Sequence, residues 1–499
     1  MKYENLFKKG AYIFFMLFFI WGCFAFPNYG ISIDEGVSRM QNGEINYNFI
    51  KTGVATDLFS TNEKYHGPAY ELFLFTVEKI FNVTEYRDIY LLRHGLTFLT
   101  FFISVVFFYF IGLKVFKSHV AALFGCIMLV ISPRIFAESF YNSKDLPMLS
   151  FCIIASYTMF LFLERQTIRM ALIHAACCAF VIDIRLTGLL LPFITVYMYI
   201  FQSKKQILPA FLFLFYTVIF IIAFWPVLWL DPISHFISAF KQMSNYQGGE
   251  VLYMGNYVST LNLPWHYLPV WIIITTPVLY ILLFIAGMFF LIKNSIIDFF
   301  STLPIQSFLI MFSAPILVVI FLNSTVYDAW RHVYFIYPYF LLIAVYGSIH
   351  FFRILKGNRS ILIISCISAF SILSVLFFMV KNHPFQNVYF NSLAGKNLRQ
   401  NFELDYWGLS YRQGLEYILA TDKSETIYIE ADPVFQFCQM NALIIRPEDR
   451  KRIIFTYDRG AADYFLSNFR WHPGDFNFGK SVYQINVGDE KIMEVLKLK

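Results

Sequence analysis

The sequence predicts a mainly α, polytopic helical membrane protein with a small α/β domain at its C-terminal end. The first observation is composition, since 58% of the 499 residues are hydrophobic, only 14% are charged, and the mean hydropathy is +0.57. The second is the recurrence of apolar runs that are long enough to cross a bilayer as helices. The third is a change after about residue 381, where short β-branched runs alternate with polar turns.

The apolar runs predict about eleven membrane-spanning helices in the first 380 residues. The predicted spans are residues 11–27, 91–113, 119–133, 146–163, 169–183, 187–201, 207–230, 267–292, 304–322, 333–352 and 360–380. The first of them has the basic flank and apolar run of a signal peptide, but no small-x-small cleavage site follows it. We therefore expect an uncleaved span.

Basic residues predict the orientation of these spans. Lys8, Lys9, Lys114 and Lys117 fall in segments on one side of the membrane, whereas the short loops on the other side hold few basic residues. By the positive-inside rule the N-terminus is cytoplasmic, and an odd number of spans then places the C-terminus outside. The sequence thus predicts a multi-pass protein of the inner (cytoplasmic) membrane. Its net charge of +6 is spread between spans, so no nucleic-acid partner is expected.

The chain divides into two predicted domains. Residues 1–380 form the membrane domain, whose first outer loop covers residues 27–90 and carries predicted helices over Val37–Tyr47 and Tyr70–Phe81. Residues 381–499 form the extracytoplasmic α/β domain. Its expected elements are a helix over Tyr411–Ala420 and β-branched runs at Thr426–Glu430, Ala442–Ile445, Ile453–Thr456 and Ser481–Val487.

Polar residues gather at the outer ends of the predicted spans. They are Asp34, Glu35, His66, Glu138, Lys144, Asp145, Asp183, Arg185, Tyr327, Asp328, Arg331 and His332. Singly, each has an ordinary structural explanation, such as a local ion pair or a snorkelling arginine. Together they predict one outward-facing cavity, because charge near lipid is costly unless it has a partner or a task. Carboxylates with arginines suit general-base attack by a hydroxyl with a phosphate as the leaving group.

These features resemble the GT-C superfamily of integral-membrane glycosyltransferases, in the branch that includes protein O-mannosyltransferases and aminoarabinose transferases. Four stretches carry the resemblance: Asp34-Glu35, His66-Gly67-Pro68, Lys144-Asp145-Leu146-Pro147 and the run from Trp330 to Pro338. His-Gly-Pro stands where better-known members have His-Pro-Pro or Lys-Pro-Pro. The stretch from Asp405 to Arg412 also looks like one found in bacterial members.

The resemblance implies an inverting glycosyltransferase that moves a hexose or pentose from a polyprenyl-phosphate donor. The acceptor would be an extracytoplasmic hydroxyl on a cell-envelope glycan, a lipid or a protein. It implies Asp34 as the general base, supported by Glu35.

The resemblance also implies roles for other site residues. Glu138 and Asp145 would bind the acceptor or a divalent cation, with Asp145 as the expected metal ligand if there is one; no other cofactor is expected. The expected ligands of the donor phosphate are Arg185, Arg331, His66 and Lys144. Asp405 and Trp407 would line the acceptor path or seal the C-terminal domain against the membrane part.

Two readings of another class remain open at this stage. A carrier or flippase would usually show paired halves with broken helices and mid-span charges, and the sequence shows no such symmetry. A non-catalytic component of an envelope polysaccharide assembly system would keep the fold, but Asp34 would then be dispensable. A different GT-C chemistry, such as phosphoethanolamine transfer, is a further alternative.

Overall fold

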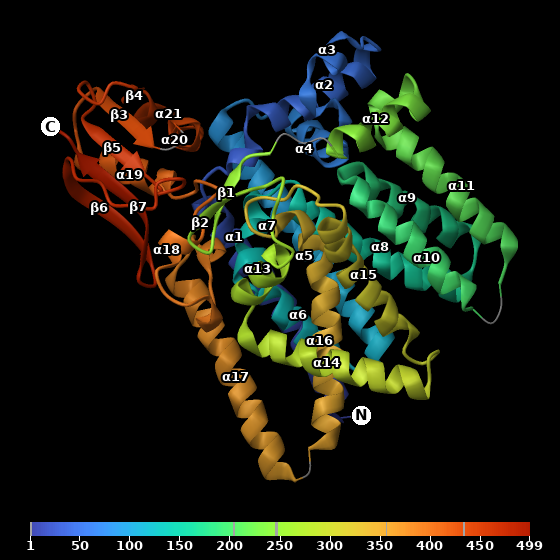
Figure 1. Ribbon diagram of the computed structural model, residues 1–499. Helices are drawn as coiled ribbons and strands as arrows, with labels where there is room; N and C mark the ends of the chain where they lie inside the picture. The colour runs from blue at the N-terminus through green and yellow to red at the C-terminus, as the bar shows by residue number, and fades with distance from the viewer. Residues whose placement is uncertain (1, 203–204, 245–247, 356, 433–434) are drawn as a thin grey trace.

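A computed structural model describes residues 2–202, 205–244, 248–355, 357–432 and 435–499. It confirms the predicted fold class, because a bundle of apolar helices carries a β-sheet unit at its C-terminal end (Figure 1). The N-terminus lies toward the lower end of the bundle in Figure 1, and the C-terminus lies beside the sheet at the upper left. The protein is therefore an integral membrane protein with a sheet unit outside the bundle.

Eight helical segments in the described residues are long and apolar enough to cross a membrane. Their helices are α1 (Lys2–Ala25), α5 (Tyr86–Phe116), α8 (Asp145–Arg165), α11 (Ile207–Phe224), α14 (Val278–Ile297), α15 (Leu303–Phe321), α16 (Tyr337–Ile354, preceded by η6, Arg331–Ile336) and α17 (Asn358–Lys381). A ninth span exists if α6 (His119–Val130) and α7 (Pro133–Tyr141) count as one, since they meet at 67°. Pro133 begins α7 and lacks the N–H that a straight helix would need there.

Besides residues 119–133, which fall in the 12-residue α6, two predicted spans form helices that are shorter than a full crossing. Residues 169–183 fall in α9 (Ile168–Ile184), which has 17 residues, and residues 187–201 fall in α10 (Leu190–Ile200). A bilayer core about 30 Å thick requires about 20 helical residues. The predicted span 267–292 is also divided, because Pro277 separates α13 (Tyr267–Thr275) from α14. Sequence hydropathy located these runs without showing where they break.

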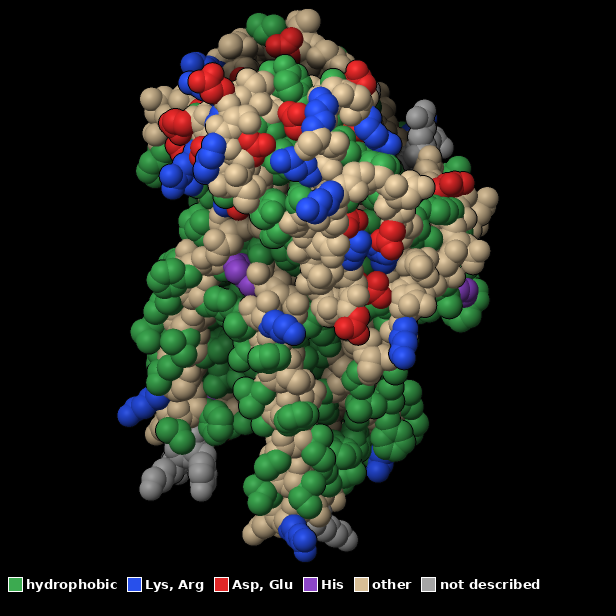
Figure 2. Space-filling model, turned by 90° about the vertical axis from the view of Figure 1, so that its left-hand side faces the viewer, with side chains coloured by type: hydrophobic (Ala, Val, Ile, Leu, Met, Phe, Trp, Pro, Cys, Tyr) green, Lys and Arg blue, Asp and Glu red, His purple; other side chains and the backbone are tan. Residues whose placement is uncertain are grey.

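The first outer loop folds into short helices at the upper end of the bundle (Figure 1). They are α2 (Val37–Thr52), α3 (Thr56–Ser60) and α4 (Ala69–Ile80), which confirms the two predicted helices. Farther along the chain, α12 (Pro232–Ser244) and the hairpin of β1 (Glu250–Tyr253) and β2 (Asn256–Ser259) lie at the same end. Figure 2 shows acidic and basic side chains concentrated on this upper part, above a lower region covered largely by hydrophobic side chains.

The C-terminal unit is a five-stranded mixed sheet in the order β4-β3-β5-β7-β6. Its strands are β3 (Ile427–Asp432), β4 (Ile453–Phe455), β5 (Tyr464–Ser467), β6 (Lys480–Val487) and β7 (Glu490–Lys497). β3 runs parallel to both β4 and β5, whereas β7 runs antiparallel to β5 and β6. The helices of this part are α18 (Leu398–Asn401), α19 (Tyr411–Thr421), α20 (Phe435–Ala442) and α21 (Pro447–Arg450).

The structure confirms the predicted helix over Tyr411–Ala420 and three of the four expected β-branched strands. The fourth prediction is wrong, because Ala442–Ile445 forms the end of α20 and a turn. Ile444 is buried there against Ile31 and Tyr90 of the membrane part, so its apolar character reflects docking rather than a strand. β7 was not predicted, since Glu and Lys, which are uncommon in strands, begin it.

The packing around the His-Gly-Pro turn explains why residue 67 is a glycine. Gly67 packs against the end of α9 so closely that a Cβ atom there would lie 1.1 Å from the carbonyl oxygen of Asp183. Pro68 then precedes the first residue of α4. A proline or any larger residue at position 67 would thus push α4 and α9 apart.

Replacing Gly67 with alanine is expected to lower the free energy of unfolding by about 1–3 kcal/mol, because overpacking forces the backbone to shift. Gly95→Ala is the matched control, since the nearest atom to a Cβ there is 4.0 Å away and alanine favours a helix interior by about 1 kcal/mol. Thermal unfolding of the full chain in detergent micelles measures both. A Gly67→Ala protein at least as stable as Gly95→Ala would contradict the packing argument.

Candidate active site

Arg331 lies at the centre of a buried network of charges. It begins η6, and its Nη1 donates to Asp34 Oδ2 at 2.7 Å and to Asp145 Oδ2 at 3.3 Å. Its Nη2 donates to Asp328 Oδ2 at 3.1 Å. The guanidinium also lies 4.7 Å from the ring centroid of Trp407. One cation therefore holds together the first outer loop, the start of α8, the loop before η6 and the C-terminal part.

The network continues on both sides of Arg331. Asp145 Oδ1 pairs with Arg185 at the end of α9, and Asp328 Oδ1 accepts a hydrogen bond from Arg470 Nη2 at 2.7 Å. Three arginines thus face three aspartates. This balance matters because a buried charge is tolerated only when it is paired and hydrogen-bonded.

Asp34 is the most exposed carboxylate of the network. Its side chain is 20% exposed, against 1% for Asp145 and 3% for Asp328. It sits in η2 (Ile33–Glu35), which is anchored by a hydrogen bond from the Ile33 N–H to the carbonyl of Trp407 at 3.3 Å. Of the three carboxylates, Asp34 is therefore the one that an incoming molecule can reach.

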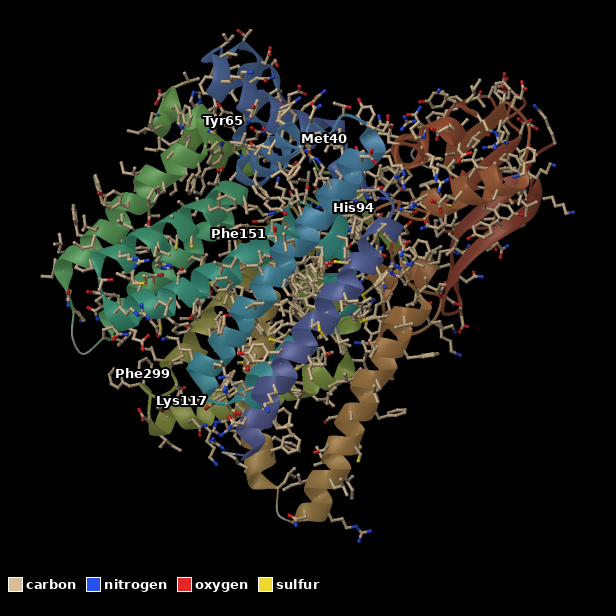
Figure 3. All side chains as sticks on the ribbon, turned by 180° about the vertical axis from the view of Figure 1, so that it is seen from behind. Met40, Tyr65, His94, Lys117, Phe151 and Phe299 are labelled. Atoms are coloured by element: carbon tan, nitrogen blue, oxygen red, sulfur yellow. The ribbon has the colours of Figure 1, made fainter. Side chains whose placement is uncertain are left out.

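Glu35 is buried and stabilises the loop in which Asp34 lies. Its Oε2 accepts hydrogen bonds from the Ser32 backbone N–H at 3.0 Å and from Ser32 Oγ at 3.1 Å, which forms a capping box. Its Oε1 lies 3.0 Å from Nε2 of His94, which Figure 3 shows toward the upper end of α5. These contacts give Glu35 a positioning role beside Asp34.

Glu138 is fully buried and accepts three hydrogen bonds. Asn142 Nδ2 donates to its Oε2 at 2.8 Å, and the hydroxyls of Tyr334 and Tyr406 donate to its Oε1 at 2.7 and 2.9 Å. Asn142 Nδ2 also donates to Asp145 Oδ2 at 3.1 Å. Glu138 therefore joins α7, η6 and the C-terminal part, and both of its carboxylate oxygens already accept hydrogen bonds.

The surroundings of Asp145 do not fit a divalent cation in this arrangement. Its two oxygens face the guanidinium groups of Arg185 and Arg331 and the amide of Asn142. Within the described ranges, no group of three or more His, Cys, Asp or Glu side chains is placed to hold a metal ion. A cation here would require the arginines to move away.

A pocket with about 290 Å³ of empty volume opens beside the Asp145–Arg185 pair. His66, Lys144 and Arg185 line it, together with Tyr65 and Trp225. His66 and Lys144 also line an adjoining pocket of about 310 Å³. Nε of Arg185 is buried and makes no hydrogen bond. Three of the four residues predicted to bind phosphate thus line one pocket, and the fourth, Arg331, contacts Asp145 behind it.

Asp405 and Trp407 belong to the C-terminal part of the chain, which contacts the network through Trp407. Asp405 Oδ2 accepts hydrogen bonds from the Ser410 backbone N–H at 2.9 Å and from Ser410 Oγ at 2.6 Å, which fixes the turn before α19. Burial raises the pKa of Asp405 above its ordinary value, although the bonds from Ser410 oppose the shift. Trp407 is buried against Arg331. These contacts favour the sealing role for both residues.

Sequence reasoning missed several residues that hold the site. Arg470 follows β5, where the local sequence gave no sign of contact with the membrane part. Tyr406 lies between the predicted site residues Asp405 and Trp407, but no role was predicted for the tyrosine itself. Arg93 pairs with Glu71 at 2.7 Å and with Glu78 at 2.6 Å beneath the adjoining pocket. Here a signal existed, since Arg93 interrupts a long apolar run.

Comparisons with known proteins agree with this architecture. The family described as dolichyl-phosphate-mannose-protein mannosyltransferase matches residues 65–230, which include the His-Gly-Pro turn, Lys144, Asp145 and Arg185. A search of curated protein sequences finds no significant match.

Solved structures of two proteins share the fold. The structure of ArnT from Cupriavidus metallidurans bound to undecaprenyl phosphate is 11% identical, with a TM-score of 0.51, and the alignment covers 97% of this chain and 98% of that one. The apo Archaeoglobus fulgidus oligosaccharyltransferase is 10% identical with a TM-score of 0.51, over 87% of this chain but only 62% of that protein. The chain therefore has the fold of these two solved membrane proteins, and its residues 65–230 match the mannosyltransferase family model.

Proposed function

We propose that this protein is an inverting glycosyltransferase that moves a hexose or pentose from a polyprenyl-phosphate donor to an extracytoplasmic hydroxyl. The observation that carries the proposal is the cationic pocket of His66, Lys144 and Arg185, which lies one ion pair away from the Asp34–Arg331 contact. The matching family description names a lipid-phosphate sugar, and ArnT, which shares the fold, binds undecaprenyl phosphate. Both support a lipid-phosphate donor for this chain.

The pocket is suited to a phosphate group. Arginine and lysine bind phosphate through charge-assisted hydrogen bonds, and such bonds are stronger in a site shielded from water. Nε of Arg185 makes no hydrogen bond in this structure, so it has a donor to offer. Bound phosphate would also draw the guanidinium group of Arg185 away from Asp145.

Asp34 is proposed as the general base. Its pairing with Arg331 favours the ionised carboxylate, which is the form that can accept a proton. Asp34 would take the proton of the acceptor hydroxyl while that oxygen attacks the anomeric carbon from the side opposite the phosphate. The carbon–oxygen bond to phosphate breaks, and the phosphate leaves with the electron pair and is stabilised by the cations of the pocket.

The other predicted site residues act through position in this proposal. Glu35 fixes the η2 loop, Asp145 pairs with Arg185 of the pocket, and Glu138 joins α7 to Tyr334 and Tyr406. An acceptor that is a cell-envelope glycan, a lipid or a protein would approach Asp34 from outside the membrane.

We further propose insertion in the inner membrane with the N-terminus in the cytoplasm and the C-terminus outside. The labelled residues in Figure 3 support this orientation, because Lys117 lies at the lower end of the bundle and Tyr65, which lines the pocket, lies at the upper end. Basic residues favour the cytoplasmic side. The pocket would then face the space outside the cytoplasm.

The proposal predicts that Asp34→Asn lowers the turnover number by about 10²–10⁴-fold, the usual contribution of a general base. The assay is transfer from radiolabelled polyprenyl-phosphate sugars in membranes that contain the full chain. Glu35→Gln is the matched control, since it neutralises the adjacent carboxylate and should retain far more activity. An Asp34→Asn protein as active as wild type would rule out the mechanism, and a parallel chelator arm tests whether a divalent cation takes part.

A second prediction concerns the donor phosphate. Removing the charge of Lys144 with Lys144→Gln should raise the KM for the donor about 10–100-fold, because a hydrogen bond to a charged group contributes about 1.5–3 kcal/mol. Lys64→Gln removes the same charge from η3 (Asn62–Tyr65), at a residue that lines neither pocket, and its KM should stay near that of wild type. Equal effects in the two variants would mean that Lys144 contributes only general surface charge.

A further inference from the structure

Arg470 joins the loop after β5 to the charge network. Its Nη2 donates to Asp328 Oδ1 at 2.7 Å, and its Nη1 donates to the backbone carbonyl of Tyr406. The other oxygen of Asp328 accepts from Arg331, whose Nη1 donates to Asp34 Oδ2 at 2.7 Å. Three consecutive hydrogen bonds therefore connect a side chain of the C-terminal part to the proposed base.

Asp328 is shared between two arginines, with one oxygen for each. Its side chain is only 3% exposed, so water is largely excluded from both contacts. Without Arg470, both oxygens of Asp328 would be open to Arg331, and arginine favours two parallel hydrogen bonds to a carboxylate. Arg331 would then turn toward Asp328, and its hydrogen bond to Asp34 would lengthen. Arg470 therefore limits how far Arg331 can turn from the proposed base.

Arg470 also affects the balance of charge around Asp34. Asp328 and Glu403 are the carboxyl groups that attract Arg470 most strongly, and Asp34 attracts it more weakly. Removing Arg470 would leave three aspartates of the network facing two arginines. An excess of negative charge disfavours the ionised form of a neighbouring carboxyl group. Asp34 would then hold its proton more tightly, and it would be a poorer acceptor for the proton of a hydroxyl.

Both loops that meet at this contact hold bulky or branched residues in left-handed backbone conformations. In the loop before η6, φ is +54° at Asp328 and +64° at Ala329. On the other side, φ is +61° at Phe469 and +59° at Trp471, which flank Arg470 in the sequence. Residues other than glycine rarely adopt such angles, and those that do cluster at functional sites. The strain on both sides supports a role for the pair beyond joining two loops.

The guanidinium of Arg470 is fixed by the aromatic rings around it. It lies 4.8 Å from the ring centroid of Trp471 and 5.4 Å from that of Phe437. The indole of Trp471 is in turn hydrogen-bonded to Glu403, which also accepts from the backbone of Leu252. The guanidinium therefore cannot turn without losing these contacts.

We propose that Arg470 is a positioning residue of the transfer reaction, which holds one oxygen of Asp328 and so keeps Arg331 turned toward Asp34. The inference rests on the proposed transferase function, because it concerns the proposed base. It assigns the C-terminal part a role in the reaction itself. Arg470 acts through its neighbours and does not touch the reacting atoms.

Transfer kinetics in membranes that contain the full chain test this role. Arg470→Gln should lower the turnover number about 10–100-fold, because a small displacement of a catalytic group can cost about 10²-fold. The KM for the donor should stay near that of wild type, since Arg470 lines neither pocket beside Lys144. Arg470→Lys keeps the charge, so its turnover number should lie between those of wild type and Arg470→Gln.

Arg450→Gln is the matched control. Arg450 also joins the C-terminal part to the membrane part, but it pairs with Glu85 at 2.9 Å rather than with the charge network. Its turnover number should match that of wild type. Thermal unfolding confirms that each variant is folded. If Arg470→Gln does not fold, Arg470→Met, which retains packing on Trp471 without the charge, takes its place with the same expectations.

The state of Asp34 can also be followed without transfer activity. A water-soluble carbodiimide with an added amine converts accessible carboxyl groups to amides, and peptide mass spectrometry locates the product. Asp34 is 20% exposed, so the reagent can reach it. Arg470→Gln should raise the labelling rate of Asp34 about 3–10-fold, because a weaker ion pair leaves more of the reactive protonated form. Arg450→Gln should leave the rate unchanged.

The two assays separate the positioning role from the proposed function. Wild-type turnover and wild-type labelling of Asp34 in Arg470→Gln would overturn the positioning role, while the proposed function would stand. Equal losses of turnover in Arg470→Gln and Arg450→Gln would also overturn it. If no donor supports transfer by wild type but labelling of Asp34 rises only in Arg470→Gln, the proposed function is wrong, while the control of Asp34 by Arg470 stands.

Discussion

The buried guanidinium of Arg331 is the interaction on which the arrangement of this protein depends. A buried cation needs partners, and Arg331 finds them in three aspartates that are far apart in the sequence. Removing one partner of a buried ion pair typically costs about 3–5 kcal/mol. The outer loop, the start of α8 and the C-terminal part are therefore fixed relative to one another by the same group that contacts the proposed base.

This constraint also places the chemistry at one end of the bundle. Below the network the helices expose apolar side chains, such as Phe370 and Phe377 of α17 at 76% and 67%. Above it lie the cationic pocket and the sheet unit (Figures 1 and 2). The proposed lipid-phosphate donor would keep its chain among apolar surfaces while its phosphate reaches Lys144 and Arg185.

The sequence was sufficient to predict the long apolar helices, the two helices of the first loop and the polar residues that gather at one end of the bundle, because hydropathy and motif order are local properties. It predicted eleven spans where the described residues hold eight or nine. It did not predict breaks such as the 67° bend before Pro133, which depend on how helices pack. The long-range ion pairs could not be predicted from the sequence either. Arg470 and Asp328 are 142 positions apart, and nothing in the sequence near Arg470 indicates its partner. The buried turn at Ala442–Ile445 was predicted as a strand because docking surfaces and strands have similar apolar composition.

The most direct test of the central claim is an experimental structure of the full chain with undecaprenyl phosphate bound. The account predicts phosphate oxygens within about 3 Å of Lys144 Nζ and the Arg185 guanidinium, in the pocket beside Asp145. It also predicts that Arg185 turns from Asp145 toward the phosphate while Asp34 stays accessible from outside. A phosphate bound elsewhere, with the Arg185–Asp145 pair unchanged, would contradict the account.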